Sequence, residues 1–275
     1  MNNNYKYVLV LCLSVLASCD DGAAPDLQDD QGTAALPQIQ SESSAQPGGS
    51  TAVTVPAHII RGVNSPARTA EQIERDPARL PGQVLALAGL SEGDRIAEIT
   101  AFGQYYSVIL AEAIGPQGHL YMYDMPYLEA FGAVESGTAF AEAHANTDYE
   151  VVDYSVIQLP DDLDGVYNVL YYHDLEPQDV STAELNEKIY NALRPGGRYL
   201  IVDHKAEDGS GWRDAATIHR MAKETIVEEV TAAGFELIAD SDILAHPEDD
   251  RTTMVFNPGV RGGTDRAVLV FQKPR

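Results

Sequence analysis

The chain has 275 residues and is strongly acidic, with 42 Asp and Glu against 18 Lys and Arg and a formal net charge of −24 at pH 7. Phosphate backbones and anionic lipid headgroups repel such a chain, so nucleic-acid binding is not expected, nor membrane contact through the protein surface. The two cysteines are Cys12 and Cys19, so no disulfide framework is expected in the body of the chain.

The N-terminus has the pattern of an export signal. Lys6 precedes an apolar run over residues 8–17, which is too short to span a bilayer as a helix, since that needs about 20 residues. The run ends in Leu16-Ala17-Ser18-Cys19, which is similar to a bacterial lipobox. We therefore predict a signal peptide over residues 1–18 and a lipidated Cys19. The alternative is an ordinary cleaved signal beside a chance cysteine.

Residues 19–55 are rich in Ala, Asp, Gln, Gly, Pro and Ser and show no apolar period. Such a composition cannot bury enough apolar surface to offset its chain entropy, so it predicts a disordered tether. The expected organisation is a lipid-anchored protein of the cell envelope, facing the periplasm or the cell exterior. Its single domain would cover residues 56–275.

Within that domain, short apolar stretches alternate with longer amphipathic ones. The pattern predicts strands over residues 95–99, 119–124, 149–152, 166–171, 199–203, 235–239 and 267–272. It predicts helices over residues 106–114, 128–144, 182–193 and 223–233. This alternation favours a parallel α/β sheet with helices on both faces. Sheets of that kind bind ligands at the carboxyl ends of their strands.

Several motifs resemble a known family. Residues 93–124, and Leu-Arg-Pro-Gly-Gly at 193–197 before a strand, are similar to class I S-adenosylmethionine-dependent methyltransferases. The second half is closer still to a subgroup of predicted, mostly exported methyltransferases of unassigned substrate. The matching segments are residues 172–175, 202–206, 209–211, 218–221, 233–235, 249–252, 255–258 and 261–266.

The resemblance implies a Rossmann-like seven-stranded sheet, with six parallel strands and the last one antiparallel. It also implies S-adenosylmethionine as cofactor, with the ribose hydroxyls on Asp124. The residues expected along the cofactor or in its pocket wall are Glu98, Thr100, Gly103, Tyr105, Asp124, Met125 and Tyr172.

The glycine loop after the first strand departs from the family pattern. It reads Thr-Ala-Phe-Gly-Gln over residues 100–104, and only Gly103 remains of the expected glycines. Phe102 and Gln104 stand where the subgroup usually has glycine. Their side chains are expected either to fill the cofactor site or to require a positive φ, at about 1 kcal/mol or more each.

Two His–carboxylate pairs follow neighbouring strands. His173-Asp174 and Asp203-His204 should meet in one crevice, where His219 could join them, and such pairs suit general acid–base catalysis. Alternatively, these side chains only cap strand ends. Three histidines with two aspartates would also suffice for zinc or iron. Because no close His-x-His or His-x3-His spacing occurs, no metal site is assigned.

Three functions remain open at this stage. The first is a methyltransferase that acts on an unknown small molecule, with His173 as the base. The second is a methyltransferase fold that has lost its cofactor and serves as a binding or scaffold protein in the envelope. The third keeps the pocket but uses its His–Asp pairs for another reaction class. The fold alone cannot distinguish them.

Overall fold

The computed structural model describes residues 53–275. The predicted signal peptide, Cys19 and the tether up to residue 52 lie outside the described residues. Within residues 53–275, no helix combines the length and the apolar character that a membrane crossing requires.

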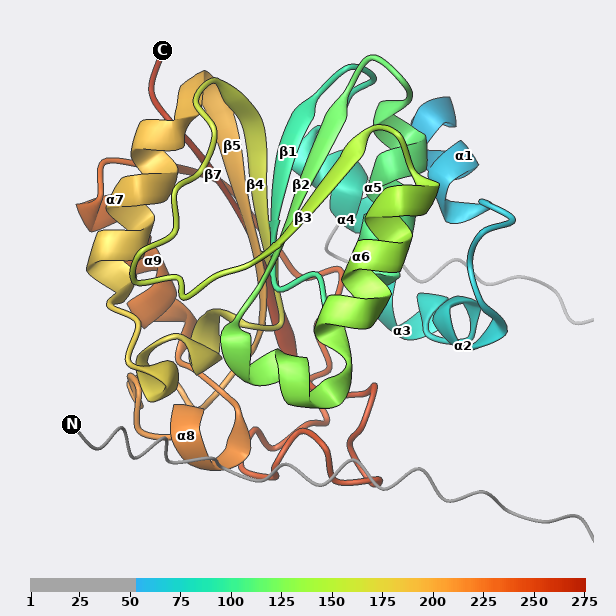
Figure 1. Ribbon diagram of the computed structural model, residues 1–275. Helices are drawn as coiled ribbons and strands as arrows, with labels where there is room; N and C mark the ends of the chain where they lie inside the picture. Colours follow the sequence, from blue (N-terminus) through green and yellow to red (C-terminus); the bar gives the residue numbers. More distant parts are fainter. Residues whose placement is uncertain (1–52) are drawn as a thin grey trace, which may run out of the picture. The chain divides into compact units, whose positions relative to one another are not determined.

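A seven-stranded sheet forms the centre of the domain (Figure 1). Its order is β3-β2-β1-β4-β5-β7-β6, and only β7 runs antiparallel to its neighbours. The fold class predicted from the sequence is therefore confirmed. The strands are β1 Arg95–Ile99, β2 His119–Asp124, β3 Thr147–Val151, β4 Leu163–Val169, β5 Leu193–His204, β6 Glu236–Ser241 and β7 Arg266–Gln272.

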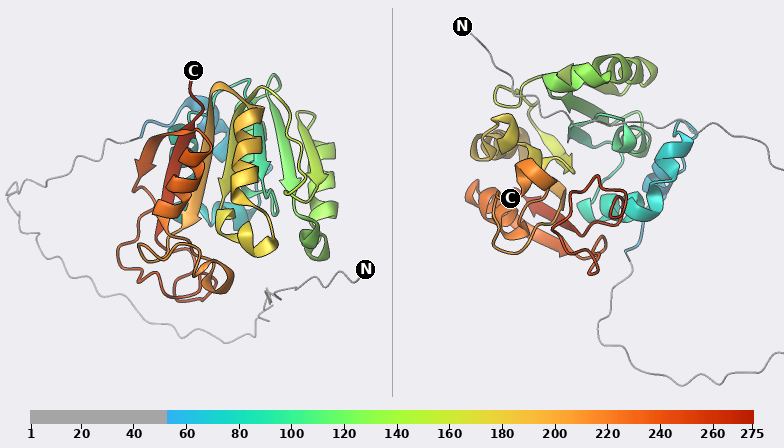
Figure 2. Two further views of the ribbon diagram at one scale, coloured as in Figure 1. Left: turned by 90° about the vertical axis from the view of Figure 1, so that its left-hand side faces the viewer. Right: turned by 90° about the horizontal axis from the view of Figure 1, so that it is seen from below.

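Helices cover both faces of the sheet (Figures 1 and 2). One face carries α1 (Ala57–Val63), α4 (Pro81–Ala88) and α5 (Tyr105–Ile114), with α6 (Ala133–Ala143) over β3. The other face carries α7 (Thr182–Ala192) and α9 (Lys223–Ala232). The shorter helices are α2 (Ala70–Ile73), α3 (Asp76–Arg79), α8 (Ala215–Ile218) and the 3-10 helices Pro126–Phe131, Tyr172–Asp174 and Glu176–Gln178.

Alternate side chains of the strands point to opposite faces of the sheet, so the domain has two hydrophobic cores, one on each face. In β7, Leu269 and Phe271 pack into the core beneath α7 and α9, whereas Val268 and Val270 pack into the core beneath α4 and α5. Successive side chains of a strand point to opposite faces, so an uninterrupted apolar run is the pattern of a strand covered on both sides.

Three elements differ most from their predicted bounds, and the others match them or shift by one or two residues at an end. The helix predicted over residues 128–144 is interrupted at Gly132, whose φ of 86° ends a 3-10 turn before α6 begins. Strand β4 ends at Val169, two residues early, because Leu170 adopts a φ of 60°. Strand β5 starts at Leu193 and includes the Pro-Gly-Gly segment that we expected to precede it.

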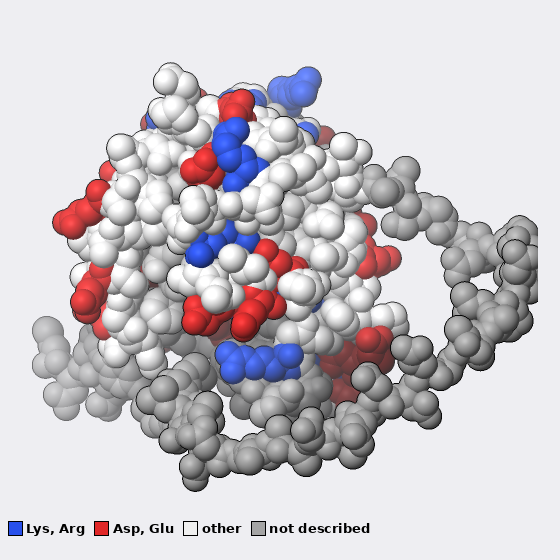
Figure 3. Space-filling view, turned by 90° about the vertical axis from the view of Figure 1, so that its right-hand side faces the viewer, with Lys and Arg blue, Asp and Glu red and all other residues white. Residues whose placement is uncertain are grey.

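Charges are mixed on the face that carries α1 and α5. Figure 3 shows most basic side chains there lying next to acidic ones. Arg61, for example, pairs with Glu92 and Glu112. A single-sign patch of the kind that binds polyanions is not seen on this face.

Candidate active site

A pocket of about 890 Å³ lies at the carboxyl ends of β1, β4 and β5. Its walls come from α2 and α3, the loop between β1 and α5, the segments that follow β4 and β5, and residues 255–266. Figure 2 (right) shows the segment before β7 beside the N-terminal helices at this end of the sheet. This is the edge at which ligands bind in open parallel sheets.

The loop after β1 takes a tight, left-handed course. Thr100, Gly103 and Gln104 have φ values of 63°, 79° and 47°, so the expected backbone strain falls on Gln104 and Thr100, while Phe102 has no positive φ. The Tyr154 hydroxyl accepts from the Thr100 N–H at 2.9 Å, and Gln72 Nε2 donates to the Gly103 carbonyl at 3.2 Å. The strained loop is therefore fixed from two sides.

Most of the side chains of this loop leave the pocket open. Phe102 lines the pocket but is 43% exposed, so it does not fill the site. Thr100 and Tyr105 also line the pocket, and the Tyr105 hydroxyl donates to Asp76 at 2.7 Å. A Cβ on Gly103 would meet nothing within 4 Å, so its φ, rather than close packing, favours glycine there.

Glu98 is a buried acid in the pocket wall. It is 6% exposed, and its carboxyl group accepts one hydrogen bond within residues 53–275, from the Ser107 hydroxyl at 2.6 Å. Burial, helped by the nearby charge of Asp124, raises the pKa of Glu98 to about 8. A buried carboxyl group with spare acceptor capacity is suited to an ammonium group of a ligand.

Replacing Glu98 with glutamine should stabilise the domain at alkaline pH. Because the pKa of Glu98 is about 8 in the folded state and ordinarily near 4.5, the parent protein loses stability as pH rises through that interval, by on the order of 1.4 kcal/mol per unit of pKa. Glutamine keeps an acceptor for Ser107 but does not ionise. Urea unfolding at pH 5 and pH 9 measures the difference. Equal stability of parent and variant at pH 9 would contradict the assignment.

Asp124 lies beside the pocket but outside its lining. It is fully buried, and its two carboxylate oxygens accept from the Phe102 N–H at 2.9 Å and the Tyr149 hydroxyl at 3.0 Å. Burial raises the pKa of Asp124 to about 6 despite these two bonds. Met125 is also buried, and its sulfur accepts from the Tyr154 N–H.

These placements test the fit of S-adenosylmethionine. The methionyl end fits, because Glu98 offers a buried acid to an ammonium group at the floor of an open pocket. A carboxylate has about four lone-pair sites, so Asp124 retains acceptor capacity for ribose hydroxyls. Tyr149 and the Phe102 backbone cover it, however. The residues fit the cofactor provided that Tyr149 moves aside.

His173 and Asp203 form the buried centre of the site. Asp203 is fully buried and accepts from His173 Nδ1 at 2.6 Å, from the His173 backbone N–H at 2.8 Å and from the His204 N–H at 2.8 Å. Burial alone would lower the pKa of His173, but Asp203 and Asp174 raise it to about 9. His173 is therefore an imidazolium at neutral pH.

His204 has the opposite character. Its ring lies 5.9 Å from that of His173, and its Nδ1 is 2.8 Å from the Thr264 hydroxyl. Burial and the positive charges of His173 and Arg266 hold the pKa of His204 well below its usual range. Within residues 53–275 its Nε2 has no hydrogen-bond partner, and the residue lines the pocket. In the tautomer whose Nδ1 donates to the Thr264 hydroxyl, the Nε2 of a neutral His204 can accept a proton.

Asp174 connects His173 to His219. Asp174 Oδ1 lies 3.4 Å from His173 Nε2 and 2.9 Å from His219 Nδ1, and the two histidines lower the pKa of Asp174 although burial opposes them. Ligand atoms of these three residues lie within 4.8 Å of one another. The group could therefore hold a metal ion, with Asp203 orienting His173 from behind.

The five residues expected to carry acid–base chemistry are thus brought together: His173, Asp174, Asp203, His204 and His219. Of the residues expected along the cofactor or in the pocket wall, Glu98, Thr100 and Tyr105 line the pocket, whereas Gly103, Asp124, Met125 and Tyr172 do not. Tyr172 differs most from its expected place. It is fully buried outside the pocket lining, where its hydroxyl donates to Glu229 at 2.9 Å and accepts from Asn186 at 2.8 Å. Tyr172 and His173 are consecutive residues of the 3-10 helix after β4, yet only His173 lines the pocket.

Sequence reasoning missed the arginines of the pocket. Arg75 and Arg79 reach it from the N-terminal helices, Arg261 from the segment before β7 and Arg266 from the start of β7. The spacing of Arg75 and Arg79, four residues apart, is the helical spacing that places two side chains on one face. This spacing is the one feature of the sequence that indicates Arg75 and Arg79 act together.

No model of a known protein family matches the chain, and no curated protein matches it in sequence. Solved structures share its fold. An S-adenosylmethionine-dependent methyltransferase from Aquifex aeolicus has a TM-score of 0.53 and 17% identity, covering 74% of this chain and 97% of its own. One from Mesorhizobium loti has a TM-score of 0.52 and 16% identity, covering 71% and 98%. The [4+2]-cyclase SpnF has a TM-score of 0.51 and 17% identity, covering 78% and 91%. The fold is therefore that of class I methyltransferases.

Proposed function

We propose that this chain is an S-adenosylmethionine-dependent methyltransferase that acts on a small molecule. The observation that carries the proposal is Glu98, a buried acid with one hydrogen bond at the floor of a pocket of about 890 Å³. The fold of the methyltransferase neighbours supports it. The cofactor, when bound, supplies an electrophilic methyl group, and Glu98 and Asp124 would hold its ammonium and ribose ends.

The remaining residues of the site act on the acceptor. His204, neutral and with a free Nε2, takes the role of the base that receives the acceptor's proton. His173, which we first expected to be the base, is charged at neutral pH and serves instead as a hydrogen-bond donor fixed by Asp203. Asp174 lies between His173 and His219 and connects the two rings. General base catalysis of this kind contributes roughly 10²–10⁴-fold to a rate.

A second candidate is a His–Asp enzyme of another reaction class in the same pocket. The covered carboxylate of Asp124 favours it, because a ribose must displace Tyr149 to reach that group. The fold allows it, since one neighbour of equal similarity is a cyclase. A binding protein without catalysis is the third candidate, and the same observation favours it.

We place the protein in the cell envelope, anchored through a lipid on Cys19 after removal of residues 1–18, with the pocket facing the periplasm or the exterior. This proposal rests on the lipobox-like sequence alone. Its membrane association is through the lipid, and its expected partner is the small-molecule acceptor.

Thermal unfolding of the full chain with and without S-adenosylmethionine tests the proposed function. A ligand at 100 times its dissociation constant stabilises a protein by about 2.7 kcal/mol, which is a midpoint shift of roughly 5–11 °C for a domain of this size. The Glu98→Gln variant should reduce the shift. The matched Glu112→Gln variant, at an exposed position of α5, should retain it. Absence of a shift at millimolar cofactor would leave the other two candidates.

A further inference from the structure

Four arginines converge on one side of the pocket: Arg75, Arg79, Arg261 and Arg266, here called the arginine cluster. Arg75 and Arg79 lie over the ring of Tyr105, with guanidinium carbons 4.9 Å and 4.5 Å from its centroid. The Tyr105 hydroxyl is fixed by Asp76. Arg266 donates to the Ala78 carbonyl and so joins the start of β7 to α3. The four arginines therefore come from two segments that are far apart in the sequence and that contact each other at the pocket.

None of the four has an ion pair within residues 53–275. By contrast, Arg68 pairs with Asp76 and Arg220 with Asp249. Arg95 and Arg198 also have no ion pair within residues 53–275, but they lie outside the pocket lining. The pocket is also lined by Glu71, Glu74, Glu98 and Asp174, yet none of these acids lies within ion-pair distance of the cluster. In a chain of net charge −24, four cations without a carboxylate partner in one cavity are a departure from the surrounding pattern.

The positive charges within the arginine cluster repel one another. Partial burial and the charges of Arg79 and Arg261 lower the pKa of Arg75 to about 10. Burial and Arg79 lower the pKa of Arg266. The same positive charge helps to keep the neighbouring His204 neutral. An anion bound among these side chains would relieve the repulsion and would gain charge-assisted hydrogen bonds.

We infer that the acceptor substrate of this pocket carries an anionic group, a carboxylate or a phosphate, which the arginine cluster binds. The inference rests on the proposed function and names its substrate class. Guanidinium groups present planar forks that match these anions, with which they form paired hydrogen bonds. The cluster faces the pocket that His204 also lines, so the anion would direct the rest of the substrate toward the base.

The arginine cluster could instead bind the carboxylate of the cofactor. The two candidate anions, one on the substrate and one on the cofactor, differ in one respect. A substrate anion binds beside the cofactor, whereas an anion that occupies the cofactor's own carboxylate site competes with it. We assign the cluster to the substrate because Arg266 begins β7, which lies on the far side of β5 from β1 in the sheet, and Arg261 lies on the segment before β7.

The test is the thermal midpoint of the full chain titrated with inorganic phosphate against sodium chloride of equal ionic strength. We expect a saturable rise with phosphate only. The Arg79→Gln variant should raise the apparent dissociation constant about tenfold or more, and Arg261→Gln, which alters a different segment, should do the same. The matched Arg213→Gln variant, an exposed arginine paired with Glu207 and Asp214, should leave it unchanged.

Repeating the titration with saturating S-adenosylmethionine separates the sources. Additive shifts support a substrate anion. Competition between phosphate and cofactor would overturn the assignment to substrate. A phosphate effect equal in the parent and in both cluster variants, or absent in the parent, would overturn the anion site itself. If the cofactor gives no shift but phosphate does, the methyltransferase proposal fails while the anion site stands.

Discussion

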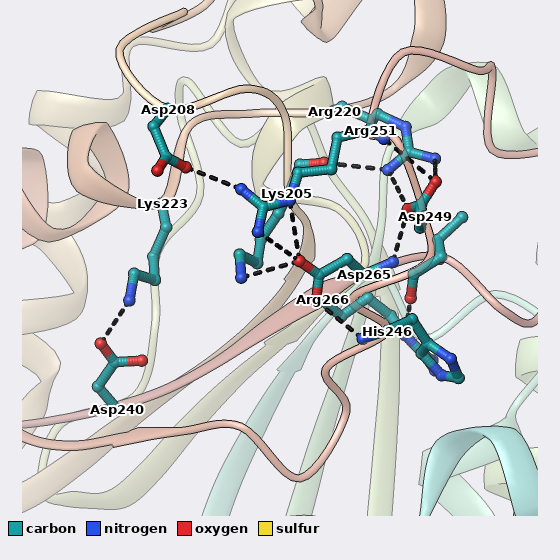
Figure 4. Close-up of polar contacts among 11 residues, drawn as sticks. Lys205, Asp208, Arg220, Lys223, Asp240, His246, Asp249, Arg251, Asp265 and Arg266 are labelled. Carbon is teal, nitrogen blue, oxygen red and sulfur yellow. Dashed lines mark hydrogen bonds and ion pairs between the residues drawn. The ribbon is translucent and has the colours of Figure 1, made fainter.

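Replacing Asp249 with alanine should lower the free energy of unfolding by roughly 3–5 kcal/mol, because it leaves a buried guanidinium without its counter-charge. The side chains of Arg220 and Asp249 are 0% and 1% exposed, and two hydrogen bonds of 2.7 Å and 3.1 Å join them (Figure 4). Asp249 also accepts from the Asp265 N–H at 2.7 Å. Arg220 would retain only backbone carbonyls as partners.

Urea unfolding followed by circular dichroism measures this effect. The adjacent Asp250→Ala variant is the control, because Asp250 is exposed and bonds locally to the Thr252 N–H, and we expect little change from it. A double variant with Arg220→Met and Asp249→Leu should recover much of the loss, since no charge is then left buried. Equal losses in the Asp249 and Asp250 single variants would contradict this account of the pair.

The Arg220–Asp249 pair also belongs to a network that supports the pocket. Arg251 donates to Asp265, and Lys205 pairs with Asp265 at 2.9 Å, so the segment before β7 is tied to the end of β5 (Figure 4). That segment carries Thr264 and leads into Arg266, the first residue of β7, and both residues line the pocket. Loss of Asp249 should therefore weaken phosphate binding as well as stability.

The sheet could be predicted from the sequence because its information is local. Strands β1 and β2 match their predicted bounds, since apolar runs flanked by turn residues identify a buried strand without knowledge of its neighbours. The resemblance added the antiparallel β7. The errors in the predicted bounds occur where a single positive φ ends a helix or a strand, as at Gly132 and Leu170. Neither the interruption nor the early strand end changes the apolar pattern.

The candidate site was predictable where topology brings its residues together. His173 follows β4 and Asp203 lies near the end of the adjacent parallel strand β5, and the His173 Nδ1 and a carboxylate oxygen of Asp203 are 2.6 Å apart. The covering of Asp124 by Tyr149 was not predictable, because it depends on the side-chain direction on a neighbouring strand. The arginine cluster was not predictable either, because its members come from opposite ends of the domain and meet only through tertiary packing.

Replacing Asp203 with asparagine should lower the pKa of His173 from its value of about 9. Asp203 is the nearest of the charges that raise this pKa, and in the variant Asp174 alone would oppose the effect of burial. The amide NH₂ would also face one of the backbone N–H groups that the carboxylate now accepts from. A pH titration of the histidine ring protons by NMR measures this, and it needs no substrate.

The same variant should change the pH dependence of stability. A histidine whose pKa is raised to about 9 stabilises the folded state fully below its ordinary pKa near 6.5, and this stabilisation is lost as pH rises through 9. In the Asp203→Asn variant that alkaline decline should move to lower pH, and methyl transfer should fall by roughly 10²–10⁴-fold. The control is Asp148→Asn, which removes the partner of the half-exposed His119 and should leave the His173 titration unchanged. A His173 pKa near 9 in the Asp203 variant would show that Asp174 alone holds the charge.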